Sequence, residues 1–382
     1  MPEGPMRIER IEVFLYTRPL EREFWMSLAP ITQSREIVVR LTTDAGLQGI
    51  GQCHGGPMEQ VGQIITGQFR EVLIGADPFE HERLWSEMFA HNHRPGWSLN
   101  GWQHETIMTA IAGVDIALWD LMGKASGRSV CKLLGGLRTE AEAYATGGYY
   151  EEGKDVAGLV DEIGVYVGEC GYKAVKLKVG RGDLADDLER VGAVRSAFPQ
   201  IDIMLDANQG WDVPTAIRAA GEFESMNIGW LEEPVHWYDE VDGLRRVAES
   251  TSIPIASGEG ETTRFGCRDL VKWGEIQVMQ FDSTVAGGIT EWRRVAAHAD
   301  AHGVKMAPHH DPQIHVHCVA GAPNGLILES FPNPDRDPIW AELIVDTEPI
   351  VDGVMSVPDR PGLGYDLNWD LLEARATKLE TR

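Results

Sequence analysis

The stretch YKAVKLKVG, from Tyr172 to Gly180, places two lysines one residue apart in an otherwise apolar run. Residues i and i+2 of a β-strand point to the same face, so Lys176 and Lys178 would project together from a strand. A solvated pair on an exposed strand is the usual arrangement for lysine. The apolar residues around these two lysines instead favour a pair that points into the protein.

The sequence around this stretch alternates between short β-like runs and amphipathic stretches from about residue 140 onward. After Asp155, apolar residues recur at i, i+3, i+4 and i+7 (Val156, Leu159, Val160 and Ile163), as on one face of a helix. Eight β-like runs over about 190 residues favour a parallel barrel, although the pattern alone also allows an open parallel sheet. The runs are AEAYATGGYY, AVKLKV, DIMLDAN, IGWLEEP, IPIASGE, EIQVMQFD, VKMAPHH and GLILES.

The first 135 residues follow a different pattern. The runs MRIERIEVFLYT and REIVVRLTTDAGLQGIGQ alternate as an antiparallel pair does, and the long helix-like stretch after them ends at Gly127. They predict an α+β module in front of the barrel. The polar and aromatic segment 91–104 is a candidate for a lid or a subunit contact.

The charge balance and the cysteines limit the partners and the compartment. The chain of 382 residues has 34 basic and 59 acidic residues, for a net charge of −25. Such a surface repels phosphate backbones and anionic lipids, so we expect neither nucleic acid nor a membrane as a partner. We also expect no membrane span or signal peptide. Five scattered cysteines without a CxxC pair favour reduced thiols, and thus a cytoplasmic protein.

Three neighbouring strands of the predicted barrel each end in a carboxylate. Asp206 ends the third run, Glu232 the fourth and Glu259 the fifth, at intervals of 26 and 27 residues. Barrel active sites lie at the C-terminal ends of the strands, so we expect these side chains to meet. Clustered carboxylates repel one another unless a cation compensates, and oxygen ligands suit Mg²⁺ before Ca²⁺ or Mn²⁺. The alternative is a set of solvated acidic loop ends.

The second run carries the two lysines beside these carboxylates, and the far side of the barrel carries a possible His–Asp pair. A lysine is a useful base only when its pKa is lowered, and a neighbouring ammonium lowers it. Asp282 ends the sixth run, and His309 and His310 end the seventh, with His309 27 residues after Asp282. A carboxylate bonded to one ring nitrogen fixes the tautomer of a histidine. An isolated His–Asp pair more often has a structural role than a catalytic one. Here, however, the pair would face two lysines and a metal.

These residues, taken in order, resemble the mandelate racemase subgroup of the enolase superfamily. Each motif is weak by itself, but their order and spacing are specific. The resemblance covers nearly the whole chain and includes LLGG at 133–136 and PGLG at 361–364. The motifs are Lys176-Leu-Lys178, Asp206-Ala-Asn208, Glu232-Glu233-Pro234, Gly258-Glu259, Asp282 to Gly287-Gly288, His309, and Glu329 at the end of the eighth run.

The resemblance implies a fold and a division of the chain. The family fold is α/β, a (β/α)7β modified TIM barrel with an α+β capping domain made from both ends of the chain. It implies a capping domain over residues 1–135, a barrel over 136–352, and a C-terminal segment over 353–382 that returns to the cap. Because the family commonly forms symmetric oligomers, we also expect a homo-oligomer.

The family's residue roles carry over to matching positions. Lys178 would be one acid/base, tuned by Lys176. His309, oriented by Asp282, would be the acid/base on the opposite face, although the adjacent His310 competes for this assignment. Asp206, Glu232 and Glu259 would bind Mg²⁺, Glu329 would hydrogen-bond a carboxylate oxygen of the substrate, and Asn208 would contact the ligands or the substrate.

This set of residues suits proton abstraction next to a carboxylate, where a divalent cation stabilises the negative charge. With bases on both faces, loss of the 3-hydroxyl would give a 2-keto-3-deoxy acid, and proton exchange at one carbon would racemise a 2-hydroxy acid. By analogy with the family we favour dehydration of an acid sugar. A muconate-cycloisomerase-like or epimerase role is disfavoured because those relatives have a lysine where this chain has Asp282. A catalytically idle barrel that only binds is improbable because every expected polar position is filled.

Two loops of the cap would close over the barrel mouth and contact the small-molecule carboxylate substrate. The loop Pro19–Pro30 carries Phe24 and Trp25 as a possible apolar wall. The loop Gly51–Gly56 carries His54 as a possible hydrogen-bond partner for a hydroxyl. Packing between the two domains is an equal alternative for these side chains.

Overall fold

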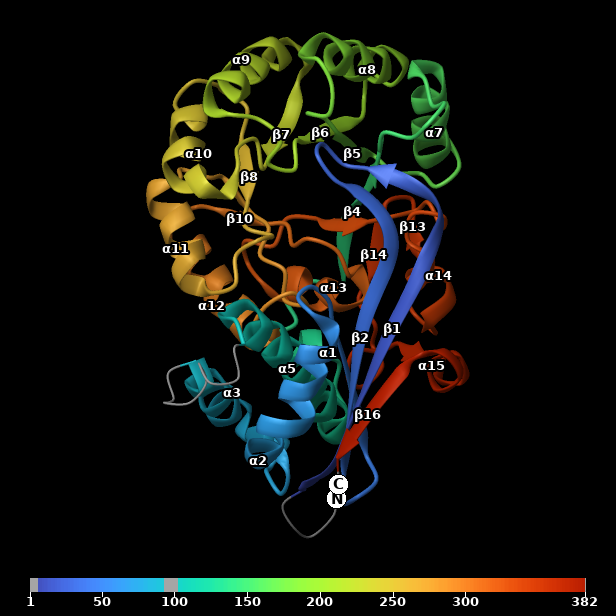
Figure 1. The fold of residues 1–382 in the computed structure, drawn as a ribbon, viewed down its shortest axis with the longest axis vertical. Coiled ribbons are helices and arrows are strands. Elements are labelled where there is room, and N and C mark those ends of the chain that lie inside the picture. Colours follow the sequence, from blue (N-terminus) through green and yellow to red (C-terminus); the bar gives the residue numbers. More distant parts are fainter. Residues whose placement is uncertain (1–5, 93–101, 382) are drawn as a thin grey trace.

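Eight parallel strands alternate with seven helices and form a (β/α)7β barrel in the computed structural model, which describes residues 6–92 and 102–381 (Figure 1). Strands β10 through β4 pair in reverse order along the sheet, and β11 pairs with β4. A bridge between Met306 and Gly325 closes the circle. The strands are β4 (Glu140–Gly147), β5 (Ala174–Lys178), β6 (Asp202–Asp206), β7 (Ile228–Glu232), β8 (Ile255–Ser257), β9 (Val278–Met279), β10 (Lys305–Met306) and β11 (Leu328–Ser330).

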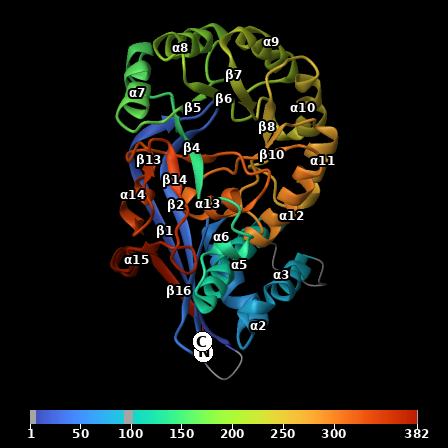
Figure 2. The same cartoon turned by 180° about the vertical axis from the view of Figure 1, so that it is seen from behind.

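The helices cover the outside of this barrel, as both views show (Figures 1 and 2). The predicted barrel is therefore confirmed, and the open sheet is excluded. The barrel helices are α7 (Val156–Gly168), α8 (Leu184–Ala197), α9 (Val213–Phe223), α10 (Glu240–Ala248), α11 (Arg264–Trp273), α12 (Gly288–Asp300) and α13 (Pro312–Gly321).

The alternation along β5 explains where the two lysines point. Ala174 belongs to a small apolar cluster that strands all around the barrel contribute to, together with Met204 and Trp230. Because side chains alternate along a strand, Lys176 and Lys178 lie on this inner face. Val175 and Leu177 instead join the large core that includes the barrel helices. The two lysines therefore line the inside of the barrel, as their apolar surroundings predicted.

The cap consists of an antiparallel sheet and a long buried helix. The sheet has the order β16-β1-β2-β3. The helix α5 lies against β3, and their backbones approach closely: a Cβ on Gly51 would lie 2.0 Å from the backbone oxygen of Gly113. The elements are β1 (Ile8–Trp25), β2 (Pro30–Thr43), β3 (Gln48–Cys53), α1 (Met58–Gln63), α2 (Arg70–Leu73), α3 (His81–Phe89), α5 (His104–Ser126), α6 (Val130–Leu133) and β16 (Thr377–Thr381).

The expectation that no segment is long and apolar enough to cross a membrane is wrong for α5. By length and composition α5 could cross a membrane, and it is the one such helix in the described part of the chain. Its apolar part, from Thr106 to Gly123, is nevertheless fully buried inside the protein. Its apolar character therefore reflects a core helix with neighbours on all sides.

The hairpin of β1 and β2 is longer than the sequence indicated. The loop expected at Pro19–Pro30 is mostly strand, because pairing continues to Trp25 opposite Pro30. The hairpin extends from the cap to the mouth of the barrel (Figures 1 and 2). There, Trp25 and Tyr150 exchange backbone hydrogen bonds of 2.9 and 3.0 Å.

The C-terminal part of the chain contacts both modules. Strand β14 (Val354–Ser356) pairs with the barrel strand β4 and with β13 (Ile350–Val351), whereas β16 pairs with β1 of the cap. Between them lie β15 (Asp366–Leu367), which pairs with β12 (Ile344–Val345), and α15 (Trp369–Arg375). Helix α14 (Pro338–Leu343) precedes β12. The division of the chain at residues 135 and 352 stays a prediction, and residues 93–101 of the candidate lid lie outside the described residues.

Candidate active site

Six consecutive strands bring the candidate site residues to one end of the barrel, in the order of the sheet. In the register of the strands, Lys178 of β5 lies opposite Asp206 of β6, which lies opposite Glu232 of β7. Glu259 follows β8 by two residues and so lies beyond the level of the other two carboxylates. Asp282 and His309 follow β9 and β10.

Lys176 forms a fully buried set of ion pairs. Its Nζ lies 2.5 Å from Glu232 Oε1, 2.7 Å from Glu329 Oε1 and 3.9 Å from Asp206 Oδ2. Burial alone would lower the pKa of Lys176, but the carboxylates of Glu232 and Glu329 outweigh it and raise the pKa well above the usual value. Lys176 is therefore a fixed positive charge.

Lys178 donates a hydrogen bond to Asp206 Oδ2 and lies 5.4 Å from the centre of the Tyr149 ring. Lys176 lowers the pKa of Lys178, as expected, but Asp206 outweighs this effect, so the net pKa is raised. Burial lowers the pKa of Lys178, but Asp206 outweighs burial and raises it, and the opposing effect of Lys176 is smaller. A carboxylate in direct contact thus decides the protonation state, not the second ammonium.

The chemistry of the three carboxylates fits a hard cation. Burial and then repulsion from Asp206 raise the pKa of Glu232 to about 8, with a further contribution from Glu259 and opposition from Lys176. The adjacent Glu233, 4% exposed, has its pKa raised well above normal by burial and by Glu259. Concentrated negative charge that forces a carboxyl to hold its proton is the state that a divalent cation relieves. Asp206, Glu232 and Glu259 would hold such an ion.

Two other groups of side chains each bring three possible ligand atoms within 4.8 Å of one another in the described part of the chain. They are His54 with Asp282 and His309, and His54 with His310 and Asp311. The three carboxylates do not meet this condition among the described residues. We assign no metal to the histidine groups, because their carboxylates already contact the imidazole rings.

His309 and Asp282 form the predicted pair. Nδ1 of His309 lies 2.8 Å from Asp282 Oδ2, and Asp282 is fully buried. Burial would lower the pKa of His309, but Glu259, the bond to Asp282 and Glu329 outweigh it and raise the pKa to about 9. His310 does not share this bond: its Nδ1 lies 3.3 Å from Asp311 Oδ2. The structure therefore favours His309 for the acid/base role.

Glu329 is already bound by groups of the protein. Oε1 accepts a hydrogen bond of 2.6 Å from Thr146 Oγ1 besides the contact with Lys176, and Oε2 accepts one of 2.9 Å from the backbone N–H of His310. Despite burial, Lys176 and His309 lower the pKa of Glu329. The predicted hydrogen bond from Glu329 to a substrate carboxylate stays a prediction.

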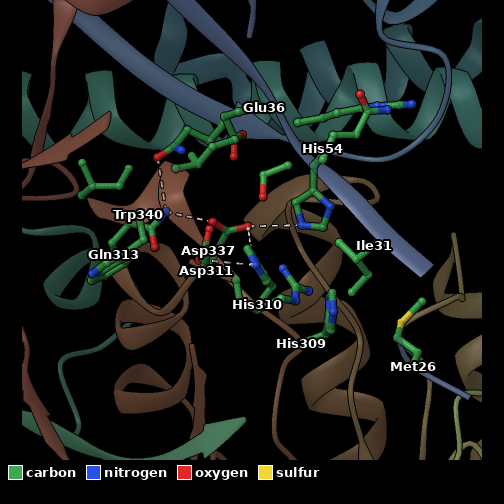
Figure 3. A pocket seen from close by; sticks show the side chains of 17 residues that line it. Met26, Ile31, Glu36, His54, His309, His310, Asp311, Gln313, Asp337 and Trp340 are labelled. Carbon is green, nitrogen blue, oxygen red and sulfur yellow. Dashed lines mark hydrogen bonds and ion pairs between the residues drawn. The ribbon is translucent and has the colours of Figure 1, made fainter. Parts of the chain in front are cut away.

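A cavity of about 260 Å³ lies between the cap and the His309 side of the barrel (Figure 3). Met26 and Ile31 at the hairpin end form part of its apolar lining. The rings of His54, His309 and His310 lie around one side of it (Figure 3). The sequence argument missed its other polar and charged lining residues, namely Gln33, Ser34, Arg35, Glu36, Gln52, Asp311, Gln313, Arg336 and Asp337.

The residues predicted to contact the substrate lie in different places in the structure. Phe24 is fully buried with its ring 5.9 Å from that of Tyr149, and Trp25 lies under the Arg181 guanidinium at 3.9 Å. Neither lines this cavity, and both pack the cap against the barrel. A contact of either side chain with the substrate stays a prediction. Asn208 follows Asp206 with a positive φ of 40°, and its buried Oδ1 has no hydrogen-bond partner.

Comparison with known proteins identifies the family. The N-terminal domain of mandelate racemase / muconate lactonizing enzyme matches residues 10–135, and the enolase C-terminal domain-like family matches residues 158–371. The chain therefore belongs to the enolase superfamily, in the mandelate racemase / muconate lactonizing enzyme group.

Individual relatives span nearly the whole chain. D-galactarolactone cycloisomerase of Agrobacterium fabrum is 32% identical over 96% of this chain and 98% of its own length. The structure of a mandelate racemase/muconate lactonizing enzyme from a marine actinobacterium in complex with magnesium has a TM-score of 0.87 at 35% identity, covering 97% of this chain and 99% of that one. The structure of L-talarate/galactarate dehydratase from Salmonella typhimurium, liganded with Mg and L-lyxarohydroxamate, has a TM-score of 0.87 at 28% identity, covering 99% and 95%.

Proposed function

We propose that this chain is a Mg²⁺-dependent dehydratase that converts an acid sugar into a 2-keto-3-deoxy acid. One observation carries the proposal: Lys178, the three carboxylates and the His309–Asp282 pair follow one another on six consecutive barrel strands. This order supports a base and an acid on opposite sides of a cation site. The relatives support a lyase or an isomerase, since they include a dehydratase and a cycloisomerase of sugar acids.

Each residue has a separate task in the proposed reaction. Asp206, Glu232 and Glu259 would hold Mg²⁺, which would stabilise negative charge on the substrate carboxylate. Lys178 in its neutral form takes the proton from C2, next to that carboxylate. Because Asp206 raises the pKa of Lys178, this role requires a bound divalent cation that offsets the negative charge of Asp206. Asp282 binds Nδ1 of His309, so that Nε2 of this ring can face the 3-hydroxyl of the substrate. Nε2 donates a proton to the hydroxyl, which then leaves as water.

The test is proton NMR in D₂O with Mg²⁺, a panel of mono- and diacid sugars, and mandelate. Loss of the C2 signal together with new C3 methylene resonances is the expected result. Exchange of the C2 proton without elimination would instead indicate a racemase. Silence across the whole panel, including after removal of Mg²⁺ by EDTA and its return, would contradict the substrate class.

The matched variants Lys178→Ala and His309→Asn separate the two tasks. We expect His309→Asn to lose dehydration by about 10³-fold while Lys178 still exchanges the C2 proton. Lys178→Ala should lose both exchange and dehydration. A His309→Asn protein that dehydrates at the wild-type rate would exclude His309 as the acid.

Cycloisomerisation of a sugar acid is a second candidate, favoured by the relative that covers 96% of this chain. It uses the same proton abstraction but loses no water. Mass spectrometry of the product distinguishes the two candidates, because a dehydrated product is lighter than its substrate by one water and a cycloisomerised product is not.

A further inference from the structure

His54 connects the cap to the His309–Asp282 pair. It follows β3 of the cap directly, and its backbone N–H donates a hydrogen bond of 3.2 Å to the backbone oxygen of Thr284, in the barrel loop after β9. The same loop holds Asp282, whose Oδ1 accepts hydrogen bonds from Thr284 N at 2.7 Å and Oγ1 at 2.6 Å. The cap and the orienting carboxylate are thus fixed to one short segment.

The ring of His54 lies between two buried carboxylates. Its Nε2 is 3.4 Å from Asp282 Oδ2, the oxygen that binds His309, and 3.3 Å from Asp311 Oδ2. The side chains of Asp282 and Asp311 are at most 5% exposed. Both carboxylates contact the Thr284 hydroxyl, at 2.6 and 2.8 Å, but a hydroxyl has only one proton to donate.

This arrangement favours a positive charge at His54. Two ionised carboxylates that share one hydroxyl in a buried place repel each other strongly. Burial would lower the pKa of His54, but the contacts with Asp282 and Asp311 outweigh it and raise the pKa well above the usual value. The imidazolium of His54 is then a common counter-ion for both.

We propose that His54 is a positioning residue for the acid/base pair: as an imidazolium it shares Asp282 with His309 and thereby moderates the basicity of His309. The inference rests on the acid/base role proposed for His309. It assigns to His54 a task other than the hydroxyl contact expected from the sequence.

Several other titratable groups surround His309, and they stay unchanged in the variants that test His54. His315 of α13 lies 3.7 Å from Asp282 Oδ1, and burial lowers its pKa, so it adds no positive charge. The remaining groups that face His309, Asp282 or His54 are Glu36 of β2, Glu259 after β8, His310 and Asp311 after β10, and Glu329 of β11.

The sign and size of the effect follow from charge repulsion. The rings of His54 and His309 have centroids 6.0 Å apart. Replacing the imidazolium by a neutral side chain removes a like charge, so the pKa of His309 should rise in His54→Gln. At an effective dielectric of about 40, between those of a buried site and water, the rise is about one pKa unit.

The test is NMR titration of the His309 ring in protein with ¹³C-labelled histidine at saturating Mg²⁺, with His309→Gln to assign the signal. We expect His54→Gln to raise the pKa of His309 by about one unit. His54→Lys, which keeps a positive charge, should leave it within about 0.3 unit of wild type. His302→Gln, on an exposed turn after α12, is the remote control and should change nothing.

Two outcomes would overturn the inference. If His54→Gln leaves the titration of His309 at the wild-type value, the ring of His54 only fills space. If His54→Gln and His54→Lys shift it equally, shape and not charge is responsible. The titration needs no substrate, so a negative result would not bear on the proposed dehydratase activity, which has its own test. Once a substrate is known, the pH at which kcat falls on the alkaline side should increase with the pKa of His309.

Discussion

Replacement of Lys176 by methionine should destabilise the metal-free protein severely, although it changes little in side-chain volume. Lys176 has no exposed surface, and its nearest carboxylate oxygens belong to Glu232 at 2.5 Å and Glu329 at 2.7 Å. At an effective dielectric of about 20, a contact at this distance is worth about 6 kcal/mol before desolvation. In the wild type this attraction compensates much of the cost of removing the ions from water. In the variant the carboxylates stay buried, but nothing compensates that cost.

Breaking a buried pair by removal of one partner costs about 3–5 kcal/mol, and we expect Lys176→Met to lose this much free energy of unfolding. Urea denaturation of the EDTA-treated protein measures it as a lower midpoint at unchanged m-value. Lys305→Met is the matched control, because Lys305 also lies on a barrel strand, β10, but is exposed. It should stay within about 0.5 kcal/mol of wild type.

Addition of Mg²⁺ gives the experiment a second arm. If Asp206, Glu232 and Glu259 bind the cation, it supplies positive charge to Glu232, one of the carboxylates that Lys176→Met leaves unpaired, and the deficit of the variant should shrink at saturating Mg²⁺. If the free energy of unfolding of the metal-free variant lies within about 1 kcal/mol of the wild-type value, the reasoning is refuted. Such a result would mean that these carboxylates do not need the ammonium of Lys176.

Two further substitutions test the cap. Gly51→Ala would place a Cβ 2.0 Å from a backbone oxygen of α5 and should lower the free energy of unfolding by at least about 1–3 kcal/mol, measured by calorimetry. Gly221→Ala on α9, where a Cβ meets nothing within 4 Å, should be neutral or stabilising. Equal melting temperatures of the two variants would exclude close packing of β3 against α5. Glu12 of β1 has its pKa lowered to about 2, because its bonds to Arg40 and Lys378 outweigh burial. Its folded pKa lies below the unfolded value of 4.5, so Glu12 contributes about 3 kcal/mol above that pH, and the contribution is lost as the pH falls towards 2. The stability gap between wild type and Glu12→Gln should therefore close between about pH 4.5 and pH 2; a gap independent of pH would contradict this account.

The sequence predicts the barrel and its site residues well because both depend on local repetition. Each βα unit has its own apolar period, and intervals of 26 and 27 residues bring Asp206, Glu232 and Glu259 to neighbouring strands. The pair of Asp282 and His309 follows from the same spacing and is observed at 2.8 Å.

Other features depend on contacts between distant segments and leave no local pattern. His54 and Asp282 are 228 positions apart, and nothing near either residue indicates that they meet. The pKa of Lys178 was predicted with the wrong sign, because spacing places Lys176 beside it but does not show that Asp206 is in direct contact. The β1–β2 hairpin was also predicted too short, because the part of the expected loop from Pro19 to Trp25 lies in β1.

The placement of the cap elements argues for a division of tasks between the two modules. The groups proposed to act on the substrate come from barrel strands or the segments directly after them, whereas the cap contacts residues beside these groups. Ser27 donates a hydrogen bond of 3.2 Å to the backbone oxygen of Asn208, and His54 contacts Asp282. The hairpin reaches these positions as paired strand, with Trp25 bonded both ways to Tyr150. A lid built in this way presents Met26 and Ile31 to the cavity in a fixed position. Changes at the hairpin end should therefore alter which substrate is accepted, while the proposed reaction stays with the barrel.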